Sequence, residues 1–269
     1  MVSDILNDKP TRLFLILAGF FVANAIVAEF IGAKIFSLED TVGIESLDLN
    51  FFGSQRSLQL SAGVLLWPVV FIMTDVINEY FGQRGVKFLS WLTVGLISYA
   101  FFMVYAAIDL VPAGWWVGQN VGAGVPDMQV AFQKVYGQGL LIIIGSILAF
   151  LLGQLIDVFA FHRIKRATGE EKVWLRATGS TLISQLIDSF VVLYIAFKGG
   201  PELTAFLGID GLSVAPPWDW GLLLSVCTVN YLYKAAVAVG LTPVIYAAHA
   251  LIDRWLGAEK ASEMKRIAA

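Results

Sequence analysis

Residues 139–161 read GLLIIIGSILAFLLGQLIDVFAF, an apolar run in which Asp157 is the one charged side chain. About 20 apolar residues in a helix cross the hydrocarbon core of a bilayer, because each residue adds 1.5 Å. The whole chain of 269 residues has 58% hydrophobic and 14% charged residues, whereas soluble domains carry about 25% charged residues. Its mean hydropathy is +0.75. We therefore expect an integral membrane protein.

Six apolar runs of this kind follow one another, and they predict an all-α protein with six transmembrane helices in one membrane domain. The runs cover residues 13–36, 58–81, 88–111, 139–161, 178–197 and 220–249. Pro68 and Pro243 lie inside two of them, where a proline kinks or ends a helix because it lacks the backbone N–H. Residues 112–132 are rich in Gly and Trp and are expected to form a loop at the membrane interface.

The positions of Lys and Arg predict the orientation, because cytoplasmic loops of membrane proteins are enriched in these residues. With the N-terminus in the cytoplasm, 13 of the 18 cations fall on the cytoplasmic side. The opposite side holds Arg56, Lys134 and Lys198. We therefore expect both termini to be cytoplasmic.

Several classes of function are disfavoured by what the sequence lacks. It has no G-x-x-x-x-G-K-[ST] phosphate loop, so we expect no ATP hydrolysis by this chain. A single cysteine, Cys227, and two histidines, His162 and His249, make a metal centre or a disulfide framework improbable. The net charge of −3 argues against nucleic acid as a partner. We expect no cofactor and no metal.

Ionisable residues nevertheless occur within or near the ends of the apolar runs. An ionised side chain that faces lipid at mid-bilayer costs roughly 2.5–3.5 kcal/mol on insertion scales. Such residues are therefore expected to face the interior of the helix bundle or a water-filled cavity. They are Glu29, Lys34, Asp75, Glu79, Asp157, Asp188 and Lys234.

Polar partners accompany these residues at spacings of three or four, which place both side chains on one helix face. The tetrapeptide Gln-Leu-Ile-Asp occurs twice, ending at Asp157 and Asp188. We read it as two similar polar stripes, since little else aligns between the two runs. The spaced pairs are Gln154 with Asp157, Gln185 with Asp188, Asp75 with Glu79, and Asn230 with Lys234, and Asn24 adds a polar residue in the first run.

Structural roles compete with functional ones for some of these residues. Asp188 and Lys234 lie midway along their runs, and they either form a buried ion pair that sets helix register or bind a ligand, or do both. Glu79 lies at the end of its run and is either a boundary residue or part of the site. Glu29 could pair with Lys34 on the same helix. The sequence leaves these alternatives open.

These motifs, in this order, resemble the queuosine precursor transporter family, also described as vitamin uptake transporters. The resemblance extends over all six runs, and the segment after Phe36 and Glu29 depart from it. The matching stretches are VANAI around Asn24, WPVVFIMTDVINEYFG at 67–82, GQLIDVFAFHRIKR at 153–166, GSTLISQLIDSF at 179–190 and NYLYKAAVAVGLTP at 230–243.

The resemblance implies a bacterial inner-membrane importer, not an enzyme, whose cargo is 7-cyano-7-deazaguanine, its aminomethyl relative or queuine. A carboxylate can accept both adjacent N–H donors of a guanine-like ring in a bidentate pair. Asp188 and Asp75 are the leading acceptors under this hypothesis, while Asp157 and Glu79 act as gating or supporting residues. The other expected substrate-binding residues are Asn24, Gln154, Gln185, Asn230, Tyr231 and Lys234.

Two other functions remain in competition. The chain could be the substrate-binding membrane subunit of an ATP-driven vitamin uptake complex, which would transport nothing without its energising subunits. A more remote alternative is an intramembrane aspartyl enzyme, although the aspartates here follow Thr or Ile and do not match the patterns of that class. Six helices leave little room for an enclosed path, which favours a homodimer.

Overall fold

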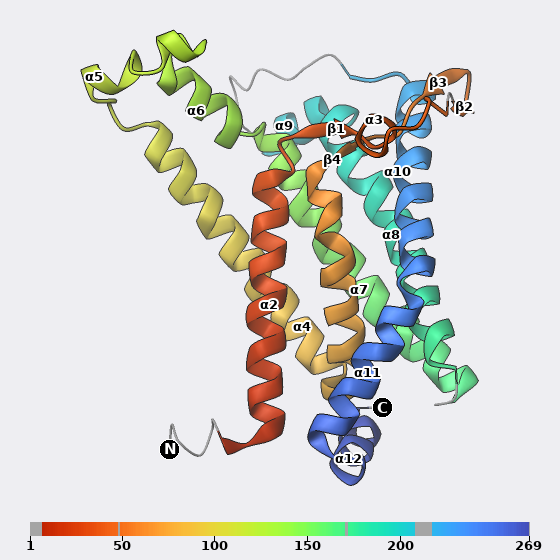
Figure 1. Cartoon of the computed structure of the whole chain (residues 1–269). Helices are drawn as coiled ribbons and strands as arrows, with labels where there is room; N and C mark the ends of the chain where they lie inside the picture. Colours follow the sequence, from red (N-terminus) through yellow and green to blue (C-terminus); the bar gives the residue numbers. More distant parts are fainter. Residues whose placement is uncertain (1–6, 48, 170–171, 208–216, 269) are drawn as a thin grey trace.

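The computed structural model describes residues 7–47, 49–169, 172–207 and 217–268. In this part of the chain, five helical stretches are long and apolar enough to cross a membrane. They form a bundle whose members run between the same two ends (Figure 1). The stretches are α2 (Lys9–Ile31), α4 (Trp67–Ile108), α7 (Leu140–Thr168) with the α6 residues that precede it, α8 (Val173–Phe197) and α10 (Trp220–Gly240).

The longest helix, α4, is divided into two arms at Gly82, whose backbone angles are φ 68° and ψ −174°. In Figure 1 the chain descends along the orange arm, residues 67–81, to this bend and rises again along the yellow arm, residues 83–108. This backbone conformation is essentially restricted to glycine. One apolar helix thereby makes two passes along the bundle.

The bend is covered by the C-terminal helix α12 (Ala258–Ala268), which follows α11 (Thr242–Leu256). A Cβ atom at position 82 would lie 3.0 Å from the carbonyl oxygen of Ala268. Nearby, Lys9 Nζ donates to the carbonyl oxygen of Trp255 at 2.8 Å. The start of α2, the bend in α4 and the last helix therefore meet at one end of the bundle, here called the C-terminal end.

The break between α10 and α11 follows from a proline. Leu241 lies between the two helices, and Pro243 occupies the first turn of α11. Pro68 likewise lies in the first turn of α4 and does not interrupt it. A proline is tolerated at these positions because the first N–H groups of a helix have no intrahelical acceptor.

The opposite end, here called the strand end, carries short elements that the apolar runs did not reveal. The predicted helices 13–36 and 58–81 each extend too far at this end. Residues 35–37 (β1) and 59–61 (β4) form a pair of antiparallel strands there instead. The Glu39 side chain stabilises this strand pair by accepting a hydrogen bond from the backbone N–H of Leu58 at 2.7 Å. The elements are β1 (Ile35–Ser37), α3 (Leu38–Val42), β2 (Leu49–Phe51), β3 (Ser54–Arg56), β4 (Gln59–Ser61), a 3-10 turn (Ala62–Leu65), α5 (Gly114–Val117), a second 3-10 turn (Val121–Ala123), α6 (Met128–Tyr136) and α9 (Gly200–Leu207).

Of the described helices, α7 and α8 share the most extensive contact. At Gly145 a Cβ atom would lie 3.0 Å from the carbonyl oxygen of Val192, so the two backbones approach more closely than larger residues allow. Small residues at helix interfaces permit this approach in membranes, where van der Waals packing replaces the hydrophobic effect as the driving force. The polar stripes of α7 and α8 consequently face one another at short range.

Replacing Gly82 by alanine should destabilise the protein, because the backbone angle is unfavourable for any residue with a Cβ atom and the new methyl group would press on α12. We expect a loss of about 1–3 kcal/mol, read as a lower midpoint of thermal unfolding in detergent. Gly95→Ala is the matched control, since a Cβ atom there has no neighbour within 4 Å. Equal midpoints for the two variants would contradict this account of the bend.

Candidate functional site: one large cavity and the carboxylates around it

The largest described cavity opens at the strand end and has a volume of about 520 Å³. We call it the strand-end cavity. Ile35 and Ser61 line it near the strands, and Asp188, Asn230 and Lys234 line it from the middle of α8 and α10. Ligand pockets in proteins measure about 300–1,000 Å³, so a small molecule fits here.

Asp188 and Lys234 form an ion pair across α8 and α10, through Asp188 Oδ2 and Lys234 Nζ. Their side chains are 20% and 11% exposed, and both line the strand-end cavity. The pair therefore links two helices and also presents polar atoms to the cavity. The sequence left open whether these two residues form an ion pair, bind a ligand or do both. The ion pair is present, and both side chains still line the cavity.

Trp67 separates the strand-end cavity from two much smaller ones, since it lines all three. Its ring stacks on Phe71 at 6.3 Å between centroids and packs against Phe150 at 5.6 Å. The two small cavities have volumes of about 20 and 10 Å³, which is room for about one water molecule each. A ring-shaped ligand therefore fits only on the strand side of Trp67.

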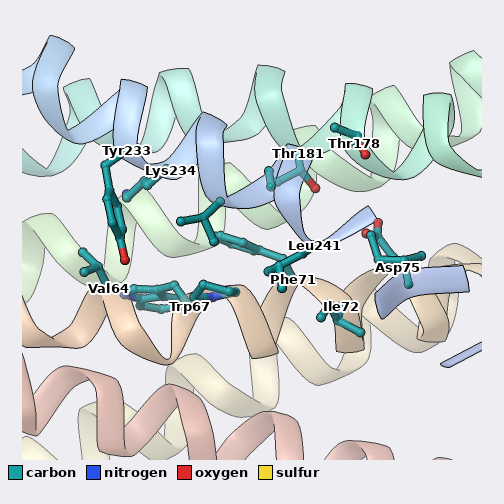
Figure 2. A pocket seen from close by; sticks show the side chains of 14 residues that line it. Val64, Trp67, Phe71, Ile72, Asp75, Thr178, Thr181, Tyr233, Lys234 and Leu241 are labelled. Atoms are coloured by element: carbon teal, nitrogen blue, oxygen red, sulfur yellow. The ribbon is translucent and has the colours of Figure 1, made fainter. Parts of the chain in front are cut away.

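The first small cavity, here the Asp75 cavity, extends from Lys234 to Asp75 between α4, α8, α10 and α11. Figure 2 shows the side chain of Phe71 between these two residues, with Thr181 on the α8 side. Apolar residues make up most of its remaining lining. Asp75 is 1% exposed, and it makes no hydrogen bond or ion pair with any residue that the structure describes.

The second small cavity, here the Asp157 cavity, is where the two Gln-Leu-Ile-Asp stretches meet. Gln154 and Asp157 from α7 line it together with Gln185 and Asp188 from α8. Thr74 Oγ1 and Gln154 Oε1 are 3.2 Å apart. Because Asp188 also lines the strand-end cavity, the Asp157 cavity continues that cavity toward the centre of the bundle.

Asp157 is fully surrounded but hydrogen-bonded on one side. Ser184 Oγ lies 3.3 Å from Asp157 Oδ1 and 3.0 Å from the carbonyl oxygen of Thr181, so its one proton is shared between them. The hydroxyl groups of Ser180 and Thr181 lie near the same carboxylate. The other oxygen, Oδ2, is buried without a hydrogen-bond partner among the described residues. The carboxylate is therefore partly stabilised in its charged form by hydroxyl donors.

The C-terminal end is closed by a buried ion cluster that joins α4, α7 and α8. Arg176 Nε and Nη2 donate to the two carboxylate oxygens of Glu79 at 3.1 and 2.8 Å. Lys165 Nζ lies 3.5 Å from Glu79 Oε1. All three side chains are at least nine-tenths buried, so Glu79 is part of the closed end and not a simple boundary residue.

Arg176 and Lys165 are the residues of this cluster that sequence reasoning missed. Both lie outside the predicted runs, which leave a gap from residue 162 to residue 177. The helix α8 begins at Val173, which brings Arg176 inside the bundle, where it is 1% exposed. Its spacing of eight residues, or about two turns, from Ser184 on the polar face of α8 was the available signal.

A neighbouring polar group ties the two C-terminal helices to α4. Tyr80 donates from its hydroxyl to Asp253 Oδ1 at 2.6 Å, and Lys265 Nζ donates to Asp253 Oδ2 at 2.8 Å. The His249 ring stacks on Tyr80 with 5.6 Å between centroids. Glu79 and Tyr80 are adjacent in the chain, so the residues just before the bend anchor α4 to α8 on one side and to α11 and α12 on the other.

The remaining predicted residues lie in different places. Asn230 lines the strand-end cavity, and its side-chain amide donates to the Val226 carbonyl at 3.0 Å. Asn24 donates to the Phe20 carbonyl of its own helix at 2.7 Å. Neither Asn24 nor Tyr231 is among the residues that line the three cavities.

Glu29 has a partner other than the one considered from sequence. It lines the strand-end cavity and accepts from Ser146 Oγ at 2.6 Å. Within the described ranges it forms no ion pair with Lys34. The described residues also contain no group of three or more His, Cys, Asp or Glu side chains that could hold a metal ion.

Comparison with known proteins gives a consistent set of relatives. A protein-family model described as "Putative vitamin uptake transporter" matches residues 61–248, a range that contains Asp75, Glu79, Asp157 and Asp188. The chain is 28% identical over 196 residues to a "Probable queuosine precursor transporter" of Bacillus subtilis (strain 168), covering 72% of this chain and 74% of the relative.

A second relative is the "Queuosine precursor transporter" of Escherichia coli (strain K12). It is 27% identical over 180 residues, which is 66% of each chain, or just under two thirds. A "Probable queuosine precursor transporter" of Haemophilus influenzae is 24% identical over 200 residues, covering 73% of this chain and 75% of the relative. No solved structure matches the chain significantly.

Changing Glu79 to glutamine should destabilise the closed end, because it removes the buried negative charge that Arg176 and Lys165 both face. Removing one partner of a buried ion pair costs about 3–5 kcal/mol, so the unfolding midpoint in detergent should fall sharply. Glu263→Gln is the control, since it breaks the exposed pair with Lys260 and should leave the midpoint unchanged. Similar midpoints for both variants would contradict a structural role for the cluster.

Proposed function

Because this chain belongs to the vitamin uptake transporter family and is a multi-pass bacterial membrane transporter, we propose that it imports a queuosine precursor, a 7-deazaguanine, by alternating access. The observation that carries the proposal is the strand-end cavity of about 520 Å³ with the Asp188–Lys234 pair in its lining. Its volume suits a bicyclic base, and its deepest polar groups come from two different helices.

The cavity offers the chemistry that a guanine-like ring requires. Asp188 Oδ2 faces Lys234, and a bound base would exchange part of this contact for its own donors and acceptor. The ring N–H and the exocyclic amine would donate to the Asp188 carboxylate, and Lys234 would donate to the ring carbonyl, as charge-assisted hydrogen bonds. Trp67, which lines the same cavity, would stack on the flat face of the ring.

Neighbouring polar residues would support this site from the side of the bundle centre. Gln185 and Gln154 line the Asp157 cavity directly beneath Asp188, where they would orient its carboxylate. Asn230 lines the strand-end cavity beside Lys234 and would add a contact to the ring. Asn24 and Tyr231 do not line the described cavities, so we propose no direct contact of these two residues with the cargo in this conformation.

Alternating access would exchange an open strand end for an open C-terminal end. In the structure, the strand-end cavity stops at Trp67, and Phe71 lines the two small cavities beyond it. The Glu79–Arg176–Lys165 cluster holds the C-terminal end together. We propose that this is the outward-open conformation. The inward-open one would require α4 to separate from α8 near Glu79 and the Trp67 side chain to move aside.

We propose six membrane crossings, because the two arms of α4 count separately, and cytoplasmic termini at the C-terminal end. Both ends of the described chain support this, since Lys9 contacts Trp255 and Ala268 approaches Gly82. An even number of crossings returns the chain to its starting side. The strand end, with the 37–57 segment and residues 112–132, would then face the periplasm.

Single cysteines should report this orientation in a Cys227→Ala background. Gln119→Cys lies in an exposed position near the strand end, and Glu263→Cys in an exposed position on α12. A membrane-impermeant maleimide added to intact spheroplasts should label position 119 and leave position 263 unlabelled until the cells are lysed. Labelling of position 263 from outside would overturn the proposed topology.

Uptake by the purified chain tests the function itself. In proteoliposomes without any other subunit, radiolabelled 7-cyano-7-deazaguanine should enter and exchange with internal unlabelled base. Asp188→Asn should weaken binding by about 10–100-fold, because it removes a charged acceptor worth roughly 1.5–3 kcal/mol per hydrogen bond. If uptake required added ATP-hydrolysing subunits, the chain would be the binding subunit of a larger complex.

A charge swap separates ligand binding from a purely structural ion pair. The double variant Asp188→Lys, Lys234→Asp restores a cation and a carboxylate between α8 and α10, so thermal stability should recover relative to Asp188→Lys alone. Base binding should not recover, because the carboxylate has moved to α10. Recovery of uptake together with stability would show that the pair serves only the structure.

A further inference from the structure

Four carboxylates form a series through the bundle from the strand-end cavity to the closed C-terminal end. Asp188 lines the strand-end cavity and the Asp157 cavity. Thr74, next to Asp75 on α4, lies 3.2 Å from Gln154, which is three residues before Asp157 on α7, so the two aspartates lie at the same level of the bundle. Glu79 follows Asp75 by four residues on the same face of α4. The series therefore runs Asp188, Asp157, Asp75 and Glu79, with contributions from α8, α7 and α4.

The two ends of this series are compensated by cations, and the two middle members are not. Asp188 pairs with Lys234, and Glu79 pairs with Arg176 and Lys165. Among the residues that the structure describes, no ion pair includes Asp75 or Asp157.

The environment of the middle carboxylates disfavours two negative charges. Asp75 and Asp157 are 1% and 5% exposed, and each has one oxygen buried without a hydrogen-bond partner among the described residues. Burial of an ionised carboxylate without a paired charge is strongly unfavourable, so such groups neutralise instead. Where two such carboxylates lie near each other, keeping one proton avoids the burial of two negative charges, as in carboxylate dyads.

The surroundings suit a proton better than a metal cation. Asp75 faces a cavity of about 20 Å³ lined mostly by apolar side chains such as Phe71 and Ile72. Hard cations such as Ca²⁺ and Mg²⁺ take six or more oxygen ligands, which this lining does not supply. A proton needs one oxygen atom, and Asp157 with its hydroxyl donors is the better place for the remaining negative charge.

We propose that Asp75 and Asp157 form a proton-binding site that couples inward proton movement to import of the base. This rests on the proposed transport function. A hydronium ion in the strand-end cavity would give its proton to Asp157 through the Asp157 cavity, and the proton would pass to Asp75. In the inward-open state, the O–H bond at Asp75 would break and the proton would leave to cytoplasmic water, regenerating the carboxylate.

The charged groups around Asp75 set the electrostatic potential that governs proton binding there. They are Glu79 on the same helix, Asp157 from α7, Arg176 from α8 and Lys234 from α10, which lines the Asp75 cavity. When the C-terminal end opens, Arg176 would separate from Glu79 and change the potential at Asp75. Proton release would thereby follow opening on the cytoplasmic side.

The test uses the purified full-length chain in proteoliposomes with radiolabelled 7-cyano-7-deazaguanine, which is neutral. An inward acid gradient of one pH unit should drive accumulation up to about tenfold for one proton per base, because each tenfold ratio corresponds to one pH unit. A protonophore should abolish the accumulation, and an internal pH dye should report acidification when unlabelled base is added outside.

Two variants locate the proton. Asp75→Asn and Asp157→Asn each remove a titrating oxygen while keeping nearly the same shape. The ratio of uptake with the inward acid gradient to uptake without it should therefore fall toward one. Asp109→Asn, at the exposed end of the same helix α4, is the control and should keep the wild-type ratio. The dye measurement on the wild-type chain needs no variant, so misfolding of either variant leaves the proposal open to refutation.

The outcomes distinguish this inference from the proposed function. If the base binds and exchanges, but its uptake does not depend on pH and is accompanied by no proton movement, the proton site is refuted and import stands. The same conclusion follows if a sodium gradient drives accumulation instead. If 7-deazaguanines neither stabilise the purified chain thermally nor exchange across the membrane, the proposed function fails and this inference fails with it.

Discussion

Burial of charge in a lipid-surrounded bundle is the constraint on which this structure depends. A carboxylate inside a membrane protein needs a cation, hydrogen-bond donors, water or a proton. Each carboxylate here has a different solution: Asp188 has Lys234, Glu79 has Arg176 and Lys165, and Asp157 has hydroxyl groups of α8. Asp75 has neither an ion pair nor a hydrogen bond with any described residue, and this is why it becomes the centre of the proposed coupling.

The paired ends and the unpaired middle suit a transporter. An ion pair that lines a cavity can exchange its contacts with a polar cargo, because Asp188 and Lys234 keep part of their surface exposed to the space. The pair at the opposite end is bidentate and buried, so it holds helices together until it is opened. Trp67, between them, keeps the centre too narrow for a ring.

Much of the candidate site follows from local sequence rules. A charged residue in an apolar run must face the interior, and spacings of three or four place its partners on the same face. These rules selected Asp188, Lys234, Gln154, Gln185 and Asp157, which the structure brings to adjoining cavities. The same rules could not decide that Asn24 bonds to its own helix, since any polar side chain near a carbonyl of the preceding turn has that choice.

By itself, the sequence determined that the chain is a helical membrane protein and which faces of its helices are polar, because hydropathy and helical periodicity are local properties. Only the tertiary structure decided which polar faces meet. The reversal at Gly82 lies inside one uninterrupted helical stretch, and its angle depends on what packs against it. Arg176 reaches Glu79 across 97 positions, a pairing set by helix packing, which no local pattern encodes.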